Sequence, residues 1–394
     1  MHLILAGRRD PSLPITSYRA KNQVSEVRLV DLRFTSDETA AYLQTVLGEH
    51  IIEDIAAILA ERADGWITGL RLEILAMRKY DNVVSKLLEL KGTTGHLKEY
   101  LISEVMDAQP SAVRHWLLST CILNRFTAPL CDALWAPDSE RGEGVIDGAA
   151  FIAKLQKDNL FLIALDMENC WFRYHHMFQN LLQSLLKLRC SPEEIAELHS
   201  RAGEWYAKYN FIEEAIQHKL GAGDVNGAIQ LFEQNRQLML NSNRWYVFEK
   251  WLPMFPNDVL QQQPELMLAQ TWVLYFQYQH ALIPPILDSV DSLLGDDPKN
   301  QSLYGEIYLF KGVNCFMQGD FHSLENIERA LKRIPVANHM VRGFAEIYIG
   351  LAGQMQGQKD RVVHALSDLL INQPLEVSRK LRILTSLVWI SGTL

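Results

Sequence analysis

Turn-forming residues recur through the second half of this chain, and the segments between them have helical patterns. The turns are expected at residues 221–224, 279–280, 319–320 and 357–360. The last intervals are about 40 residues, the length of one helix pair in an α-solenoid. Residues 319–332 combine a turn with a second helix, as in a tetratricopeptide unit, although the full consensus is missing. This spacing predicts an array of degenerate tetratricopeptide-like repeats with a concave face suited to a peptide or a small ligand.

Two capping boxes mark helix starts. Thr35 is followed by Glu38, and Ser191 is followed by Glu194, so that each hydroxyl can accept from an amide while each carboxylate reaches back. Helices are therefore expected over about residues 36–47 and from residue 192, with further ones over 51–62 and 66–78. Everything beyond residue 191 is expected to be helical hairpins.

The centre of the chain contains one convincing β-hairpin. Residues 160–165 and 170–174 are apolar and aromatic, and residues 166–169 form the turn between them. Helices are expected at 96–108, 110–123, 127–135 and 149–158 before the hairpin and at 176–188 after it, which is the layout of a winged helix. The wing carries Asp166 and Glu168, which would repel phosphates, so we interpret it as an internal switch domain and not a DNA reader.

The N-terminus begins with an apolar run, residues 1–7, followed at once by Arg8 and Arg9. A signal peptide has its positive charge before the apolar run, so this order favours a buried strand over 3–6, with a second short strand over 24–29. A core strand at residue 1 suggests a chain cut from something larger. No apolar stretch reaches the roughly 18 residues of a membrane span.

Composition limits the functional classes. A formal net charge of −9 argues against broad nucleic-acid binding. None of the five cysteines forms a C-x-x-C pair, so we expect reduced, buried thiols in a cytoplasmic protein, without a disulfide framework or a metal site. No Ser/His/Asp, Cys/His or paired-carboxylate constellation stands out, and the chain is not expected to be an enzyme.

Several blocks, in order, carry a resemblance to a known family. They are GRRDPSLP from Gly7, VRLVDLRFTSDETAAYL, ADGWITGLRLEIL, WFRYHHMF and LHSRAGEWYAKYNFIEEAIQHKLGAGD. The chain resembles the middle of MalT-like transcriptional regulators, which are ATP-dependent LuxR-family activators of the STAND class of signalling NTPases. In that family a P-loop domain is followed by a helical lid, a winged helix and a tetratricopeptide-like sensor, and a C-terminal helix-turn-helix binds DNA. No G-x-x-x-x-G-K-[ST] motif occurs in these residues.

The resemblance implies roles for three residues in a complete protein. Arg8 matches a sensor arginine that reaches the terminal phosphate, although by itself it could be a solvated strand-end residue. Trp66 lies in the lid where related proteins carry Gly-x-Pro near the adenine; here Ile67 replaces the proline, and packing of Trp66 in the core is the competing interpretation. His175 matches a histidine that can face the nucleotide in the resting state, but His175 and His176 could equally be one capping or core residue and one exposed residue.

The predicted fold is mainly α. The expected domains are a remnant of the P-loop α/β domain (1–30), a helical lid (31–92), the winged helix (93–190) and a tetratricopeptide-like α-solenoid (191–394). The resemblance implies the sensing and switch portion of a regulator, with a small-molecule inducer or regulatory protein on the repeats and self-association in the active state. ATP or ADP and Mg belong to the full-length family, and no cofactor is expected in this chain; DNA would be bound only through a missing C-terminal domain. The alternative is a standalone tetratricopeptide-like scaffold that binds protein partners.

Overall fold

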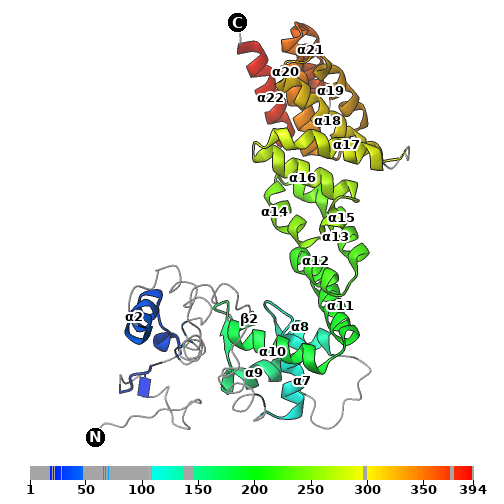
Figure 1. Ribbon diagram of the computed structural model, residues 1–394. Coiled ribbons are helices and arrows are strands. Elements are labelled where there is room, and N and C mark those ends of the chain that lie inside the picture. The colour runs from blue at the N-terminus through cyan, green and yellow to red at the C-terminus, as the bar shows by residue number, and fades with distance from the viewer. Residues whose placement is uncertain are drawn as a thin grey trace. The chain divides into compact units, whose positions relative to one another are not determined.

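The computed structural model is mostly helical, as predicted (Figure 1). It describes residues 18, 19, 21, 23–27, 29–47, 65, 67, 70, 106, 109–135, 146–158, 160–295, 300–372 and 377–392. The chain divides into two compact units, Met1–Trp205 and Tyr206–Leu394. The strand expected at 3–6, the helices expected at 51–62 and 96–108, and most of the helix expected at 66–78 lie outside the described residues.

The first described helix begins as predicted. Helix α2 (Ser36–Leu47) is preceded by Thr35, whose hydroxyl accepts the Glu38 amide at 3.2 Å, while the Glu38 carboxylate accepts the Thr35 amide at 2.9 Å. The strand expected over 24–29 is wrong. Residues 23–27 are irregular, and the short 3-10 helix η1 (Leu29–Leu32) follows them. Val24 and Val27 are exposed, and a strand is stable only when a second strand satisfies its backbone.

The central elements follow one another in the order of a winged helix. They are α7 (Ser111–Thr120), α8 (Ala128–Leu134), α9 (Gly148–Lys157), β1 (Leu162–Ala164), β2 (Phe172–Tyr174) and α10 (His176–Arg189). The strands are antiparallel, with Leu162 opposite Tyr174 and Ala164 opposite Phe172. Phe126, between α7 and α8, forms a further bridge to Phe172. The sequence did not reveal this third strand position because a single paired residue leaves no alternating pattern.

Aromatic stacking and two buried polar contacts hold this domain together. Trp116 stacks on Phe151 with ring centroids 5.2 Å apart, and the Tyr174 and Thr120 hydroxyls are 2.6 Å apart. The Gln179 side-chain amide donates to the carbonyl oxygens of Cys121 and Leu123 at 3.0 and 2.9 Å. These carbonyls follow the end of α7, so Gln179 ties α10 to groups that the helix leaves unpaired.

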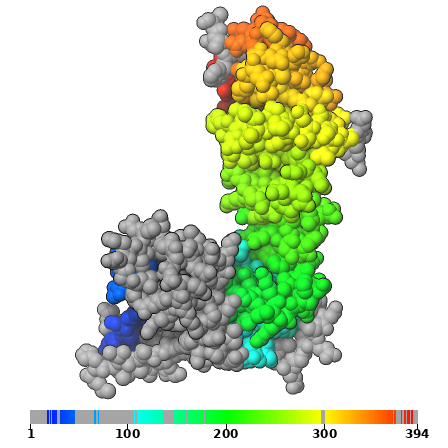
Figure 2. All heavy atoms as spheres, viewed as in Figure 1, coloured from blue at the N-terminus to red at the C-terminus, as the bar shows by residue number. Residues whose placement is uncertain are grey.

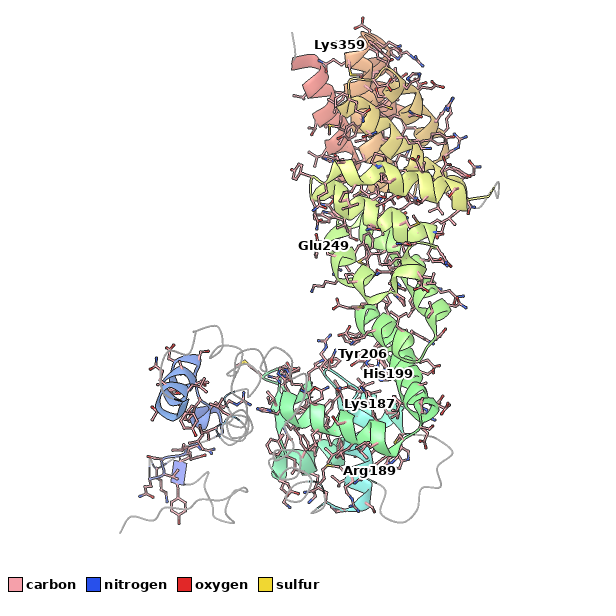
Figure 3. All side chains as sticks on the ribbon, in the orientation of Figure 1. Lys187, Arg189, His199, Tyr206, Glu249 and Lys359 are labelled. Carbon is pink, nitrogen blue, oxygen red and sulfur yellow. The ribbon has the colours of Figure 1, made fainter. Side chains whose placement is uncertain are left out.

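Helix α10 ends with residues that helix electrostatics favour, and the next helix begins with such residues. The last turn of α10 carries Lys187 and Arg189, which extend into solvent (Figure 3) and complement the negative end of the helix dipole. Helix α11 (Pro192–Lys208) begins at the second predicted capping box. The Glu194 carboxylate accepts the Ser191 amide at 2.7 Å, and the Ser191 hydroxyl accepts the Glu194 amide at 3.2 Å.

The second unit is an array of helices that stack in chain order (Figure 1). Its longer helices are α12 (Ile212–Gly221), α13 (Val225–Asn241), α16 (Pro264–Phe276), α17 (Ile283–Leu293), α18 (Gln301–Met317), α19 (His322–Arg333), α20 (His339–Met355), α21 (Lys359–Asn372) and α22 (Val377–Gly392). Short elements join them: η3 (Trp245–Val247), α14 (Phe248–Trp251), η4 (Leu252–Met254), α15 (Asn257–Leu260) and η5 (His280–Leu282). In Figure 2, the side chains of these helices pack into one continuous body. A large apolar core runs from Ile216 to Ala352, so neighbouring helix pairs share one interior.

The turns of the array repeat one backbone motif. A residue with positive φ ends the preceding helix, and the amide after it donates to a carbonyl five residues back, as in a Schellman motif. The positive-φ residues are Asn210, Gly223, Asn243, Tyr278, Gly319 and Gly357. Gly223, Gly319 and Gly357 lie within predicted turns. The asparagine turns were missed, because asparagine adopts this conformation but marks it less clearly than glycine.

One glycine of α18 allows two helices to approach closely. A Cβ on Gly312 would lie 2.6 Å from Ile327 Cγ1 of α19 and 3.1 Å from the Ser323 carbonyl oxygen. The α18–α19 pair therefore packs more tightly than any larger residue at position 312 would permit.

The turn glycine Gly319 has a different role, which a substitution can isolate. Its φ is +73°, and nothing lies within 4 Å of an added Cβ. Gly319→Ala should therefore lower the free energy of unfolding by about 1–2 kcal/mol through backbone strain alone. Urea titration measures this, and Gln318→Ala in the same turn, at φ −91°, should change it by less than about 0.5 kcal/mol. Equal effects of the two substitutions would contradict the strain argument.

Candidate functional site

Two of the three residues that the resemblance singles out, Arg8 and Trp66, lie outside the described residues. Beside Trp66, Gly65 has φ +71°, and its carbonyl oxygen accepts the Phe34 amide at 2.9 Å. A Cβ there would lie 2.8 Å from the Phe34 carbonyl oxygen. Gly65 is thus required by close backbone packing, whereas the roles of Arg8 and Trp66 remain predictions.

His175 lies at the junction between the wing and helix α10. Its amide donates to the Phe161 carbonyl oxygen at 2.8 Å, and its own carbonyl accepts the Gln179 amide at 2.9 Å. The side chain is 5% exposed, whereas the neighbouring His176 is exposed. The His175 ring meets Phe161 edge to face, with centroids 6.4 Å apart. The structure therefore encloses one histidine of the pair and leaves the other in solvent.

The backbone beside His175 is strained. Phe161 has φ +52°, an uncommon conformation for a bulky residue, and its ring packs on Phe178 at 5.0 Å. Such outliers persist only where the surroundings over-determine them, and they concentrate at switch regions. The strained residue lies just before the hairpin and is hydrogen-bonded to the residue that precedes α10. A shift of the hairpin or of α10 would therefore change the surroundings of the His175 side chain.

The tip of the wing is acidic and closed by backbone hydrogen bonds to one carboxylate. The Asp166 carboxylate accepts the amides of Cys170 and Trp171 at 2.8 and 3.1 Å, and Asn169 closes the turn at φ +52°. Glu168 and the fully exposed Met167 occupy the tip. The acidic residues that led to the sequence-based interpretation are therefore at the tip of the wing, and that interpretation stays a prediction.

A buried charge network lies inside the helical array. The Arg236 guanidinium of α13 donates to both carboxylate oxygens of Glu306 on α18, at 2.9 and 2.6 Å. The Trp272 indole of α16 donates to the same carboxylate at 2.8 Å. Arg236 is 5% exposed and Glu306 is fully buried. Three helices that are distant in sequence therefore meet at one carboxylate, in a medium where a charge is stable only when paired.

Aromatic side chains from α16, α18 and α20 surround this network. Trp272 contacts Phe310 at 4.7 Å and Phe344 at 5.3 Å, and Tyr275 contacts Phe344 at 5.3 Å. The Tyr275 and Tyr348 hydroxyls are 2.7 Å apart. Burial, then the hydrogen bond with Tyr348, raises the pKa of Tyr275, so this hydroxyl stays protonated. Tyr275 and Phe344 are half-buried, so part of each ring is accessible to solvent.

The aromatic residues of the array divide into core and surface. Trp251, Trp272 and Tyr206 are buried, whereas Tyr278 is 86% exposed. Trp205, Trp245 and Tyr275 are half-buried. The spacing of these aromatic residues along the chain predicts helices. It does not predict which of the residues lie in the core and which lie on the surface.

The described part of the chain holds no cluster of three or more His, Cys, Asp or Glu side chains that could bind a metal ion. Cys121 and Cys131 are buried and Cys170 is exposed, so the expectation of buried thiols is wrong for Cys170. Among the described helices, none is long and apolar enough to cross a membrane.

Comparison with known proteins agrees with this architecture. Residues 102–195 match the MalT winged helix domain. The HTH-type transcriptional regulator MalT of Yersinia enterocolitica is 27% identical over 369 residues, which cover 92% of this chain. MalT of Yersinia pestis is 26% identical over the same length. The chain is similar to these MalT regulators along most of its length.

The match to MalT has a limited extent. The chain spans 40% of the length of these relatives, which are named as transcriptional regulators. The MalT winged helix match encloses α7 to α10, including His175. The four domain boundaries expected from the sequence stay predictions.

The MalT-like blocks pointed to His175 but not to the Arg236–Glu306–Trp272 network. Its members are separated by 36 and 34 residues, and each is an ordinary residue for a helix. A glutamate between apolar residues of α18, in the stretch Gly305–Glu306–Ile307, was the one signal available, because a charge on an apolar face requires a partner.

The buried pair yields a prediction for stability. Glu306→Leu leaves the Arg236 charge unpaired and should cost about 3–5 kcal/mol of unfolding free energy. The double variant Arg236→Met/Glu306→Leu should be less destabilised, because no buried charge remains. Urea titration of both variants measures the difference. The exposed Glu325, paired with Arg329, is the control, and Glu325→Ala should cost less than about 1 kcal/mol. A double variant as unstable as the single one would contradict the assignment.

Proposed function

We propose that this chain is the sensing and switch portion of a MalT-like, ATP-dependent transcriptional regulator of the cytoplasm. The similarity to MalT along 92% of the chain carries this proposal. In it, the helical array recognises a small-molecule inducer or a regulatory protein, and the winged helix transmits the result. DNA contact would belong to a separate domain, in keeping with the acidic wing and the net charge of −9.

The half-buried aromatic surface of the array is the proposed recognition site. Tyr275 and Phe344 offer ring faces and edges, and the paired hydroxyls of Tyr275 and Tyr348 supply polar groups at a fixed position. Ligand sites commonly combine aromatic walls with a few such polar groups. Because the network around Glu306 joins α13 and α18 to α16, the helix that carries Tyr275, a ligand that shifts α16 would act on the other two helices.

Switching would be a population shift between a closed and an open, self-associating form. Ligand and nucleotide each change the equilibrium only as far as they bind one form better. His175 would serve as part of the latch, since it is enclosed between the wing and α10 next to the strained Phe161. Arg8 and Trp66 would contribute to a site for ATP or ADP with Mg only in a complete protein.

A thermal-shift screen tests the recognition site. With a panel of small metabolites and the 394-residue chain, we expect a stabilising ligand; at about 100 times its dissociation constant it adds about 2.7 kcal/mol. Tyr275→Ala and Phe344→Ala should each abolish that stabilisation. The matched control, Tyr278→Ala, removes an exposed tyrosine of the adjoining turn and should retain it. A ligand indifferent to both site variants would contradict the proposed location.

Titration calorimetry tests whether the nucleotide site lies outside these residues. Without a P-loop sequence, the chain should bind ATP no more tightly than about 1 mM, which corresponds to about −4 kcal/mol. ADP should bind equally weakly. Micromolar binding of either nucleotide would show that a phosphate site exists within these residues, and the proposed role as sensor and latch alone would then be wrong.

A further inference from the structure

The exposed tyrosine and phenylalanine side chains of the helical array all lie at turns. In the described part of the second unit they are Tyr209, Tyr246, Tyr278 and Phe321, exposed by 50%, 49%, 86% and 71%. Each lies within three residues of a positive-φ turn residue, which is Asn210, Asn243, Tyr278 itself or Gly319. A group of exposed aromatic side chains marks an interaction surface more often than a chance arrangement does.

These turns belong to one edge of the array. Helices joined by a short turn run in opposite directions, so alternate turns lie at the same edge. The four exposed rings occur at the turns after α11, α13, α16 and α18. The turns after α12, α17 and α19, which belong to the opposite edge, contain no aromatic residue. We call the aromatic side, with Tyr209, Tyr246, Tyr278 and Phe321, the turn edge.

Two neighbouring turns of this edge contact each other directly. The Gln277 side-chain amide, at the end of α16, donates to the Glu249 carboxylate at 2.9 Å, and Glu249 follows the turn after α13 (labelled in Figure 3). Beside this bond, Trp245 stacks on Phe276 with ring centroids 4.6 Å apart. The turns that carry Tyr246 and Tyr278 are therefore adjacent in space.

The spacing of the turns follows from the packing of the helices that end there. Helix α16 packs on α18 through Trp272 and Phe310, whose ring centroids are 4.7 Å apart. Helices in direct contact have axes about 8–10 Å apart. A polyproline II helix has three residues per turn and rises about 9 Å in that turn. Exposed rings at successive turns of the edge therefore recur at nearly the repeat of a polyproline II segment.

The chemistry of the turn edge suits an uncharged, extended partner. Tyr246 and Tyr278 carry hydroxyl groups, which can donate to the backbone carbonyls that polyproline II leaves without partners. Charges close to the rings in sequence are of both signs, as with Arg244, Glu249 and Asp320. A strongly acidic or basic segment therefore gains little there, whereas proline is uncharged and packs on aromatic rings.

We propose that the turn edge binds a proline-rich segment of a partner protein in the polyproline II conformation, with prolines packed against Tyr246, Tyr278 and Phe321. The turns are already fixed by backbone hydrogen bonds, such as the bond from the Gln279 amide to the Leu274 carbonyl oxygen at 2.9 Å. Little conformational freedom is therefore lost on binding. The surface uses different side chains from the proposed inducer site and is tested separately from it.

Fluorescence anisotropy of dye-labelled decaproline, titrated with the 394-residue chain, tests the proposal. Decaproline spans about 31 Å in polyproline II, which is enough for three rings. We expect a dissociation constant on the order of 100 µM, as for a small transient interface. A flexible Gly-Ser peptide of the same length should not bind at about 1 mM, because it must lose more conformational freedom and offers no ring to stack.

Variants of two rings locate the binding surface. Tyr278→Asn removes a ring at a positive-φ position that asparagine tolerates, and Phe321→Ala removes a second ring. Each should weaken decaproline binding about tenfold, as the loss of an aromatic anchor does. Tyr278→Phe keeps the ring and loses only the hydroxyl, so it should weaken binding about threefold.

The matched control alters the opposite edge. Val336, at the turn after α19, is 59% exposed, and Val336→Ala should leave decaproline binding unchanged. Circular dichroism should show equal helix content and melting for all variants. Absence of binding at about 1 mM chain, or equal binding by the Tyr278→Asn and Phe321→Ala variants, would overturn the proposal. Binding of an amphipathic Leu/Lys helical peptide in place of decaproline would assign the turn edge to a helical partner and overturn it as well.

Discussion

Each helix pair of the array is unable to bury its own apolar face, and this constraint shapes the second unit of the molecule. A single pair leaves one side of its helices without cover, so stability comes from the contact between successive pairs. The shared core from Ile216 to Ala352 is the result. Close packing at Gly312 and the repeated positive-φ turns set the spacing at which the next pair can stack.

The Arg236–Glu306 pair adds specificity to this otherwise apolar stacking. Apolar helices can slide past one another with modest loss, whereas a bidentate pair shared with the Trp272 indole is satisfied in one arrangement only. A buried ion pair contributes little net stability compared with apolar residues of the same volume. Its effect here is to fix the relative positions of α13, α16 and α18, and α16 also carries Tyr275 of the aromatic surface to which we assign ligand recognition.

The winged helix combines a packed core with local backbone strain. Its core is held by stacked aromatic rings and by Gln179, while Phe161 keeps an unfavourable backbone conformation beside His175. Strain of this kind is tolerated only when the surrounding packing outweighs it. The junction between the wing and α10 is therefore the place in this domain where backbone strain adjoins the enclosed His175.

Local patterns in the sequence determined the helices, the capping boxes at Thr35 and Ser191, the wing and the glycine turns, because each depends on residues within one or two helical turns of one another. The resemblance to MalT-like regulators also came from the sequence, as did His175. The incorrect strand at 24–29 shows the limit: two exposed valines resemble a strand until a pairing partner is required. Only the tertiary structure decided the meeting of Arg236, Trp272 and Glu306 and the burial of Trp272 against the exposure of Tyr278. Those features depend on the angle at which one helix pair stacks on the next, and that angle arises from side-chain packing across the whole array.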